Sequence, residues 1–262
     1  MDFSRISVGI KTFLRDEKLF YALDGIRHSL PSAQIIVADD GEMTDKKDGV
    51  YAALEREGHK VIRLPFDSGF GTKSNAITNS LSREFLLVGS DDFDFYPSDV
   101  ARGIKKMESV LDRNLELSIV SGRLAGRRPY EFYLSIIGSE VYEVPIDQVL
   151  NKADHSHPDY KSCDLTMNYN LIRREVFDKV RHDDGVKIGD GDHGAFFYDV
   201  KLAELNVGYV PGVFISNQSG LDSIRYSQYR RRANNPERSC FVKRGIRKWV
   251  LGNGHIDYEK EK

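Results

Sequence analysis

The chain has 262 residues, 40% of them hydrophobic, and a formal net charge of −2. These values fit a globular protein with a sizeable core, and the near-neutral charge argues against a protein built to coat nucleic acid. Cys163 and Cys240 are too few for a disulfide framework and form no Cys-x-x-Cys zinc motif. No run approaches the ~20 apolar residues of a membrane span, and the N-terminus lacks the apolar core of a signal peptide. We therefore expect a cytoplasmic protein without a membrane span, for which peripheral membrane association stays open.

The first 115 residues alternate predicted strands and helices. A β-rich run at 6–13 precedes a helical pattern that begins near Asp16, which is placed to cap it, and stops before Pro31. Further strands are predicted at 34–38, at 61–65 and from residue 85, with helices at 45–58, 72–81 and 97–115. This alternation predicts an α/β fold with a parallel, doubly wound sheet.

After residue 115 the pattern changes. The segments 118–124 and 131–144 are β-rich, with a hairpin turn at 137–139, and helices near 173–180 and 194–206 accompany a last strand at 209–215. The segment 151–162 is polar and rich in His, Asp and Lys, which is typical of a loop or lid. Its cluster 154–159 carries His and Asp side chains that can ligate a metal, but the surrounding composition favours a loop.

The strand that begins at Phe85 ends in three carboxylates, Asp91, Asp92 and Asp94. Unpaired buried carboxylates are costly, so acids at a strand end indicate a cationic partner. Ligands bind at the carboxyl ends of strands in open parallel sheets. The pattern therefore predicts a divalent metal that holds a phosphorylated ligand.

Asp39 and Asp40 end the second predicted strand in the same way. A carboxylate there can accept hydrogen bonds from a nucleobase or a ribose hydroxyl. The sequence Asp-Asp-Gly is equally typical of a simple turn. Two acid-tipped strands in one sheet favour a nucleotide.

The glycine-rich segment 67–75 opens a predicted helix. Its backbone N–H groups can donate hydrogen bonds to phosphate oxygens, and Lys73 can add a positive charge. The spacing of a P-loop is absent, and glycine-rich turns before helices are common.

Asp192 and His193 precede another predicted helix. Either can act as a general base, although an acid at a helix start is also a common cap. Asp164 and Asn168 lie in an otherwise apolar segment, where they can bind sugar hydroxyls or satisfy backbone groups of the core.

Basic residues crowd the C-terminal part of the chain, beginning with Arg230 and Arg231. A solvated basic face is the commoner meaning of such a run. Some of these cations can instead close over a diphosphate and neutralise it. Nucleic-acid binding fits less well, because the run has few interleaved aromatic residues.

With these residues in view, the chain resembles inverting glycosyltransferases of the GT-A fold, in the broad family-2 group. It is similar above all to the β-1,4-N-acetylgalactosaminyltransferase-like branch. The matching stretches occur in the family's order, at 11–15, 37–40, 69–75 and 90–93, at Asp164 with Asn168, at His193 with Phe196 and Phe197, and at Tyr229-x-Arg231.

Four positions depart from the pattern of that branch. Ser90 replaces the first Asp of the metal-binding triplet, and Ser74 replaces an arginine of the glycine-rich helix start. The pair Asp192-His193 stands where the family has Glu-Asp, and Asn217 stands where related enzymes have a metal-binding His.

The resemblance implies a GT-A fold, with a Rossmann-like, mostly parallel central sheet and a smaller β region on the acceptor side. It implies one domain over 1–262, in which 1–115 binds the nucleotide, 116–222 forms the acceptor and catalytic half, and 223–262 is a basic C-terminal segment. The donor would be a nucleotide sugar, most plausibly a UDP-sugar, and the acceptor a carbohydrate.

The resemblance also implies roles for individual residues. Mn²⁺ or Mg²⁺ would be held by Asp92 with Asp91, or in a second frame with Asp94, and the base would be Asp192 or His193. The donor-binding residues would be Thr12, Arg15, Asp39, Asp40, Lys73, Asn75, Asp91, Asp164, Arg230 and Arg231. Two alternatives stay open: a nucleotidyltransferase that makes nucleotide sugars, and a non-catalytic glycan-binding domain of the same fold.

Overall fold

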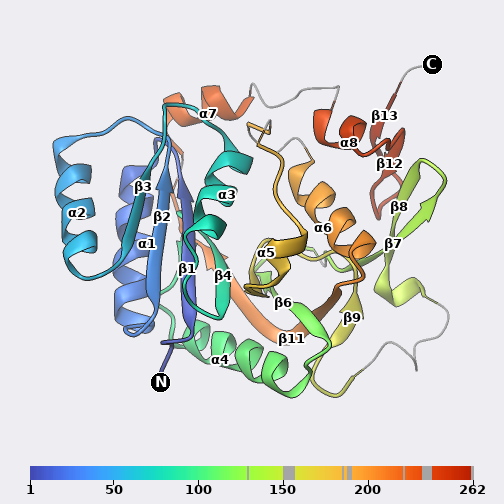
Figure 1. The fold of residues 1–262 in the computed structure, drawn as a ribbon, viewed down its shortest axis with the longest axis horizontal. Helices are drawn as coiled ribbons and strands as arrows, with labels where there is room; N and C mark the ends of the chain where they lie inside the picture. Colours follow the sequence, from blue (N-terminus) through green and yellow to red (C-terminus); the bar gives the residue numbers. More distant parts are fainter. Residues whose placement is uncertain are drawn as a thin grey trace.

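The computed structural model describes residues 1–128, 130–149, 157–184, 186–187, 191–220, 222–231 and 238–260, with Arg230 and Arg231 described by their backbone alone. Four parallel strands form the first part of the main sheet (Figure 1). They are β1 (Ile6–Thr12), β2 (Gln34–Asp39), β3 (Lys60–Arg63) and β4 (Phe85–Ser90). Their spatial order is β3-β2-β1-β4, so the carboxyl ends of β2, β1 and β4 are neighbours.

The second half of the chain extends the same sheet in the order β4-β10-β6-β11-β5. β10 runs antiparallel to both β4 and β6, and β11 runs parallel to β6. β9 and β5 each pair antiparallel with β11. The bounds are β5 (Phe93–Asp94), β6 (Leu117–Leu124), β9 (Lys161–Cys163), β10 (Asn170–Arg173) and β11 (Asn206–Asn217).

Helices cover both faces of the main sheet. Along β2, Ile35 and Val37 pack into a core shared with α1 (Asp16–Ser29), α2 (Asp45–Arg56) and α4 (Ser98–Arg113). Ile36 and Ala38 pack on the opposite side with α3 (Phe70–Asn79), α5 (Val176–Lys179) and α6 (Asp192–Leu202). Side chains of a strand alternate between the two faces, which explains how one strand serves two cores.

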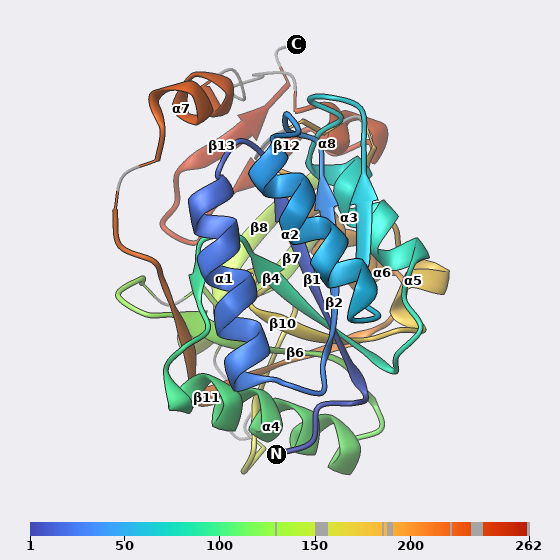
Figure 2. The ribbon, with the colours of Figure 1, turned by 90° about the vertical axis from the view of Figure 1, so that its left-hand side faces the viewer.

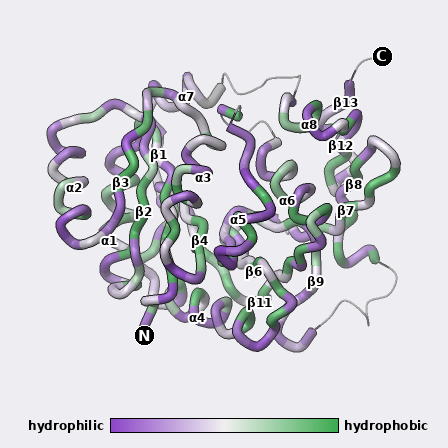
Figure 3. Tube along the Cα trace, in the orientation of Figure 1, coloured by the Kyte–Doolittle hydropathy of each residue, from purple (hydrophilic) through white to green (hydrophobic). Residues whose placement is uncertain are grey.

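The helix α4 buries one face, as its sequence pattern predicts. α4 buries Val100, Ile104, Met107 and Leu111 at helical spacing. In Figure 3 the trace of α4 alternates between hydrophobic and hydrophilic residues. Figure 2 shows α1 and α2 lying along the parallel part of the sheet.

A second, smaller sheet lies beside α6 and α8, at the right of Figure 1. Its order is β13-β12-β8-β7, and Trp249 of β12 is buried between this sheet and α6. The ring of Trp249 stacks on Phe241 of α8 at 4.8 Å. The bounds are β7 (Phe132–Ile137), β8 (Glu140–Pro145), η1 (Ile146–Gln148), α7 (Ile224–Arg231), α8 (Ser239–Lys243), β12 (Lys248–Val250) and β13 (Ile256–Glu259).

The predicted α/β class and the strand-helix alternation of the first half are confirmed, as is the hairpin at 137–139, which joins β7 to β8. The expectation that Asp16 caps the first helix is wrong, because Arg15 is the N-cap residue and Asp16 begins the helix. Residues 151–156 of the expected loop lie outside the described part. None of the helices described is both long and apolar enough to cross a bilayer.

Candidate functional site

A cavity of about 770 Å³ opens where the strands of the parallel sheet end. Lys11 and Thr12 from β1, Asp40 after β2, and Asp91 and Asp92 after β4 line this main cavity. Residues from the second half of the chain also line it: Leu124, Gly126, Arg127, Arg128, Tyr130, Met167, Asn168 and Asn217. The topology therefore collects the two acid-tipped strand ends at one edge of the sheet.

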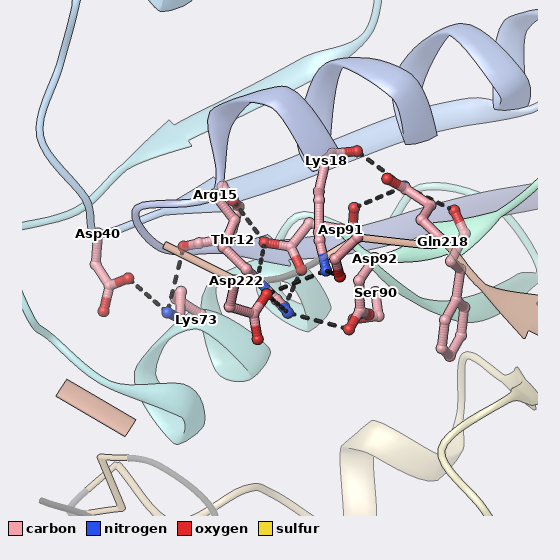
Figure 4. A network of polar contacts seen from close by, with 12 residues as sticks. Thr12, Arg15, Lys18, Asp40, Lys73, Ser90, Asp91, Asp92, Gln218 and Asp222 are labelled. Carbon is pink, nitrogen blue, oxygen red and sulfur yellow. Dashed lines mark hydrogen bonds and ion pairs between the residues drawn. The ribbon is translucent and has the colours of Figure 1, made fainter. Parts of the chain in front are cut away.

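The acidic pair after β4 is tied together by Arg15 (Figure 4). Asp91 has no solvent exposure, accepts a hydrogen bond from the Thr12 hydroxyl at 2.8 Å and forms an ion pair with Arg15. Burial raises the pKa of Asp91 to about 6, although Arg15 acts in the opposite direction. Asp92 accepts hydrogen bonds from Arg15 at 3.0 Å and from Ser90, and its side chain is 19% exposed. Asp92 is thus the member of the pair that a ligand in the cavity can reach.

Two residues that the sequence did not single out hold this acidic turn in place. The side-chain amide of Gln218 donates hydrogen bonds to the carbonyls of Asp91 and Phe93, at 3.1 and 3.0 Å, and its backbone N–H donates to the carbonyl of Asp92. Asp222 forms ion pairs with Lys18 at 3.1 Å and with Arg15 at 3.6 Å. Both lie after β11, far along the sequence from the residues they support.

Asp94 is separated from this pair. It belongs to β5, where its carboxylate accepts a hydrogen bond from the backbone of Tyr96 at 3.1 Å and contacts the Tyr21 hydroxyl. It does not line the main cavity. Asp92 and Asp94, the second predicted set of metal ligands, therefore do not converge, because the Asp94 side chain in β5 contacts Tyr21 of α1.

Asp39 and Asp40 have different environments. Asp40 lines the main cavity and pairs with Lys73, and it accepts the Gly69 N–H at 2.8 Å. Asp39 is buried outside the cavity lining. It accepts hydrogen bonds from Gly41 at 2.8 Å and from Tyr51 at 2.7 Å, and it pairs with Lys47 at 3.1 Å. Of the two carboxylates, Asp40 is the one that faces a ligand.

The glycine-rich helix start uses its amides within the protein. The N–H groups of Phe70 and Gly71 donate to the carbonyls of Lys187 and Val186, at 2.8 and 3.2 Å. A Cβ atom at Gly71 would lie 1.9 Å from the carbonyl oxygen of Asp183. The loop therefore packs against Asp183, Val186 and Lys187 rather than presenting free amides to a phosphate.

Asn75 does not line the main cavity. Its side chain donates to the carbonyl of His182 at 2.9 Å and accepts the His182 N–H at 3.1 Å. These two hydrogen bonds fix the backbone at His182.

The His182 side chain holds Asp192 at the start of α6. Nδ1 of His182 lies 3.0 Å from Oδ2 of Asp192, and its ring stacks on Phe196 at 4.5 Å. Burial raises the pKa of Asp192, but His182 and Lys11 outweigh it, so the pKa lies below its ordinary value. Asp192 is a positioned, ionised carboxylate, and its neighbour Gly191 is the N-cap, so Asp192 is not the cap of α6.

Asp192 and His193 line a second cavity of about 340 Å³, whose wall shares Phe70 and Tyr130 with the main cavity. His193 has one ring nitrogen engaged by the backbone, which leaves Nδ1 as the nitrogen that can accept a proton. Its Nε2 contacts the carbonyl oxygen of Thr166, which can only accept, so this nitrogen carries the proton. Burial also lowers the pKa of His193.

Asp164 lines neither cavity, whereas Arg238 and its partner Asp257 line the second one. Asp164 accepts the Leu134 N–H at 2.8 Å and a hydrogen bond from Lys201 at 2.6 Å, so it ties β7 to α6. In the basic segment, Arg238 pairs with Asp257, Lys243 with Asp183, and Arg244 with Asp199. The side chains of Arg230 and Arg231 and the cluster's residues 154–156 lie outside the described part.

Across the described ranges, no three His, Cys, Asp or Glu side chains converge as metal ligands. Asp92, Ser90 and Asn217 nevertheless offer oxygen atoms to the main cavity. Oxygen donors suit Mg²⁺ and Mn²⁺, and such ions are commonly bound by one or two carboxylates together with substrate phosphates and water. The residues therefore fit a cation that binds together with a phosphorylated ligand.

Comparison with known proteins supports the resemblance seen in the sequence. No family model matches the chain. Over 220 residues it is 30% identical to β-1,4 N-acetylgalactosaminyltransferase 2 of Mus musculus, and over 223 residues 23% identical to β-1,4 N-acetylgalactosaminyltransferase 1 of Homo sapiens. These matches cover 81% and 82% of this chain, which spans 39% of the length of each relative.

Solved structures of glycosyltransferases share its fold. GalNAc-T7 in complex with UDP, GalNAc and Mn²⁺ matches with a TM-score of 0.63 and 14% identity, over 88% of this chain and 47% of the other. S. aureus TarS in complex with UDP-GlcNAc matches with a TM-score of 0.57 and 12% identity, over 83% and 60%. The mannosyltransferase PcManGT of Pyrobaculum calidifontis, with GDP-Man and Mn²⁺, matches with a TM-score of 0.57 and 12% identity, over 92% and 64%. The predicted GT-A fold is confirmed.

Proposed function

We propose that this chain is an inverting glycosyltransferase that moves a sugar from a UDP-sugar to a hydroxyl of a carbohydrate acceptor. One observation carries the proposal. The main cavity, with Asp40 and Asp92 on its wall, adjoins a second cavity that contains the buried carboxylate Asp192. A donor and an acceptor could thus meet at Phe70 and Tyr130, which both cavities share.

The main cavity is the proposed donor site. Asp40 would accept hydrogen bonds from the uracil, with Thr12 and Phe13 beside it. Asp92 would hold Mn²⁺ or Mg²⁺, with Asp91 and Arg15 fixing its position. When bound, such a cation stabilises the negative charge that develops on the leaving diphosphate.

The second cavity is the proposed acceptor site. Asp192 would take the proton of the acceptor hydroxyl as its oxygen attacks the anomeric carbon. The bond between that carbon and the diphosphate oxygen breaks, and its electron pair leaves with UDP. Attack from the face opposite the diphosphate inverts the anomeric configuration. His182, which contacts Asp192 at 3.0 Å, would act as a positioning residue.

Release of UDP from a panel of UDP-sugars, with carbohydrate acceptors, tests the proposal. Asp192→Asn should lower turnover by about 10²–10⁴-fold, the usual contribution of a general base. Asp92→Asn should remove the dependence on Mn²⁺. Asp94→Asn is the matched control, since it changes the same turn outside the cavity and should leave turnover intact. Full turnover of the Asp192→Asn protein would overturn the mechanism.

One observation favours a second candidate, a non-catalytic domain that binds nucleotide sugars. Arg15 already neutralises both Asp91 and Asp92, so the acidic pair has a cation of its own. In that case calorimetry would detect UDP binding that does not respond to Mn²⁺, and no UDP-sugar would be turned over.

A further inference from the structure

Six cationic side chains of the described residues line the main cavity, and three of them have partners within the protein. Arg15 pairs with Asp91 and Asp92, and Lys73 pairs with Asp40. The Lys187 ammonium donates to the carbonyl of Asp67. These groups stabilise the walls of the cavity, and their charges are largely balanced by the protein itself.

Lys11 differs from them. Its ammonium has no hydrogen bond or ion pair to any residue that the structure describes, and its nearest aromatic contact is the ring of Phe70, at 4.1 Å. It stands at the end of β1, paired in register with Ala38 of β2 and with Ser90 of β4. Lys11 is therefore central to the row of strand ends that forms the proposed donor site.

The surroundings of Lys11 favour the binding of an anion. The side chain is partly buried, and desolvation lowers the pKa of Lys11 to about 8, while Asp192 and Asp91 act to raise it. A ring face attracts the charge of an ammonium but offers no acceptor that satisfies three N–H donors. Phosphate oxygens supply both negative charge and acceptors.

Other donors expected to serve a phosphate are occupied. The amides of Gly69, Phe70 and Gly71 donate to Asp40, Lys187 and Val186. Lys73, the cation that the sequence associated with phosphate, is held by Asp40. Among the described residues, Lys11, Arg127 and Arg128 are the lining cations without a partner in the protein, and Lys11 is the one that pairs in register with Ser90, next to the acidic turn.

We propose that Lys11 binds the diphosphate of the nucleotide-sugar donor and neutralises it as the leaving group. The inference rests on the proposed function. When the bond from the anomeric carbon to the β-phosphate oxygen breaks, the electron pair stays on that oxygen, and Lys11 donates a hydrogen bond to the diphosphate without giving up a proton.

Calorimetric titration with UDP, uridine and inorganic pyrophosphate tests the role of Lys11. Lys11→Met removes the charge but keeps the length of the side chain, and it should weaken UDP binding by roughly 10–100-fold while leaving uridine binding unchanged. Lys187→Met removes the same charge from an exposed position on the wall of the same cavity, and should weaken UDP by less than about fivefold. Circular dichroism checks folding, and Lys11→Gln decides the question if the methionine variant does not fold.

Each outcome is decisive. Loss of UDP and pyrophosphate binding with retained uridine binding supports the inference. Unchanged UDP affinity, an equal loss for uridine, or an equal effect of Lys187→Met would overturn it and leave the proposed function standing. If the wild-type protein bound neither UDP nor pyrophosphate, both would fail, and the UDP-release assay would then show no turnover either.

Discussion

Asp91 is a fully buried carboxylate, and its raised pKa links its charge to stability. Its pKa moves from an ordinary value of 3.8 to about 6 in the folded protein. Between these values the folded state binds more protons than the unfolded state, so this group makes stability fall as pH rises through that window. The contribution is on the order of 2 kcal/mol.

We expect Asp91→Asn to remove that pH dependence. The free energy of unfolding of the variant, relative to wild type, should increase between about pH 4 and pH 6. Urea denaturation at several pH values measures it. If the free energy of unfolding had the same pH dependence in the two proteins, Arg15 would be keeping Asp91 ionised throughout this pH range.

Single residues of the site were predictable to different degrees. Strand ends pointed to Asp39 with Asp40 and to Asp91, Asp92 and Asp94, because a parallel sheet gathers the carboxyl ends of its strands in one place, but they did not distinguish the members of each set. His182 and Asp222 gave no signal, since each acts through a contact made by folding. The contacts of Asp192 with His182 and of His193 with Thr166 likewise exist only in the folded protein.

The packing of α3 against Asp183 depends on one glycine. A Cβ atom at Gly71 would lie 1.9 Å from the carbonyl oxygen of Asp183, so the backbone of one of the two segments would have to shift to accommodate it. Gly71→Ala should destabilise the protein by roughly 1–3 kcal/mol. Gly49→Ala in α2 is the control, since its Cβ meets nothing within 4 Å, and it should be neutral or stabilise by up to about 1 kcal/mol. Thermal denaturation compares them, and equal midpoints would contradict the packing argument.

At the level of elements, the first half was predictable and the short strands were not. β1, β2 and β4 are long apolar runs separated by amphipathic helices, which local patterns detect. β10 has four residues, and β5 has two. Such segments show too little periodicity, and they become strands because distant partners, β4 and β6 for β10, supply the hydrogen bonds.

For the whole molecule, the shared sheet predicts cooperative unfolding. The two hydrophobic cores lie on opposite faces of the main sheet, and β2 contributes alternate residues to each of them. Trp249 is the single tryptophan of the chain and is buried in the second core. Its fluorescence and far-UV circular dichroism should therefore change together during urea denaturation.

A matched variant identifies the signal. Trp249→Phe should abolish the tryptophan fluorescence and keep the circular dichroism transition, because the smaller ring can still stack on Phe241. A fluorescence change at lower urea concentration would instead mean that the second sheet and α6 unfold before the parallel strands.

Gln218 has a consequence for how this protein can be made and divided. Its side-chain amide donates hydrogen bonds to the backbone carbonyls of Lys18, Asp91 and Phe93, and so joins segments up to 200 residues apart in the sequence. On the ribosome, the acidic turn cannot acquire its final shape until the end of β11 has been synthesised. A truncated protein ending near residue 115 would keep the parallel strands and their acids but lack the hydrogen bonds from Gln218, so its acidic turn would not be held in the shape seen in the whole chain.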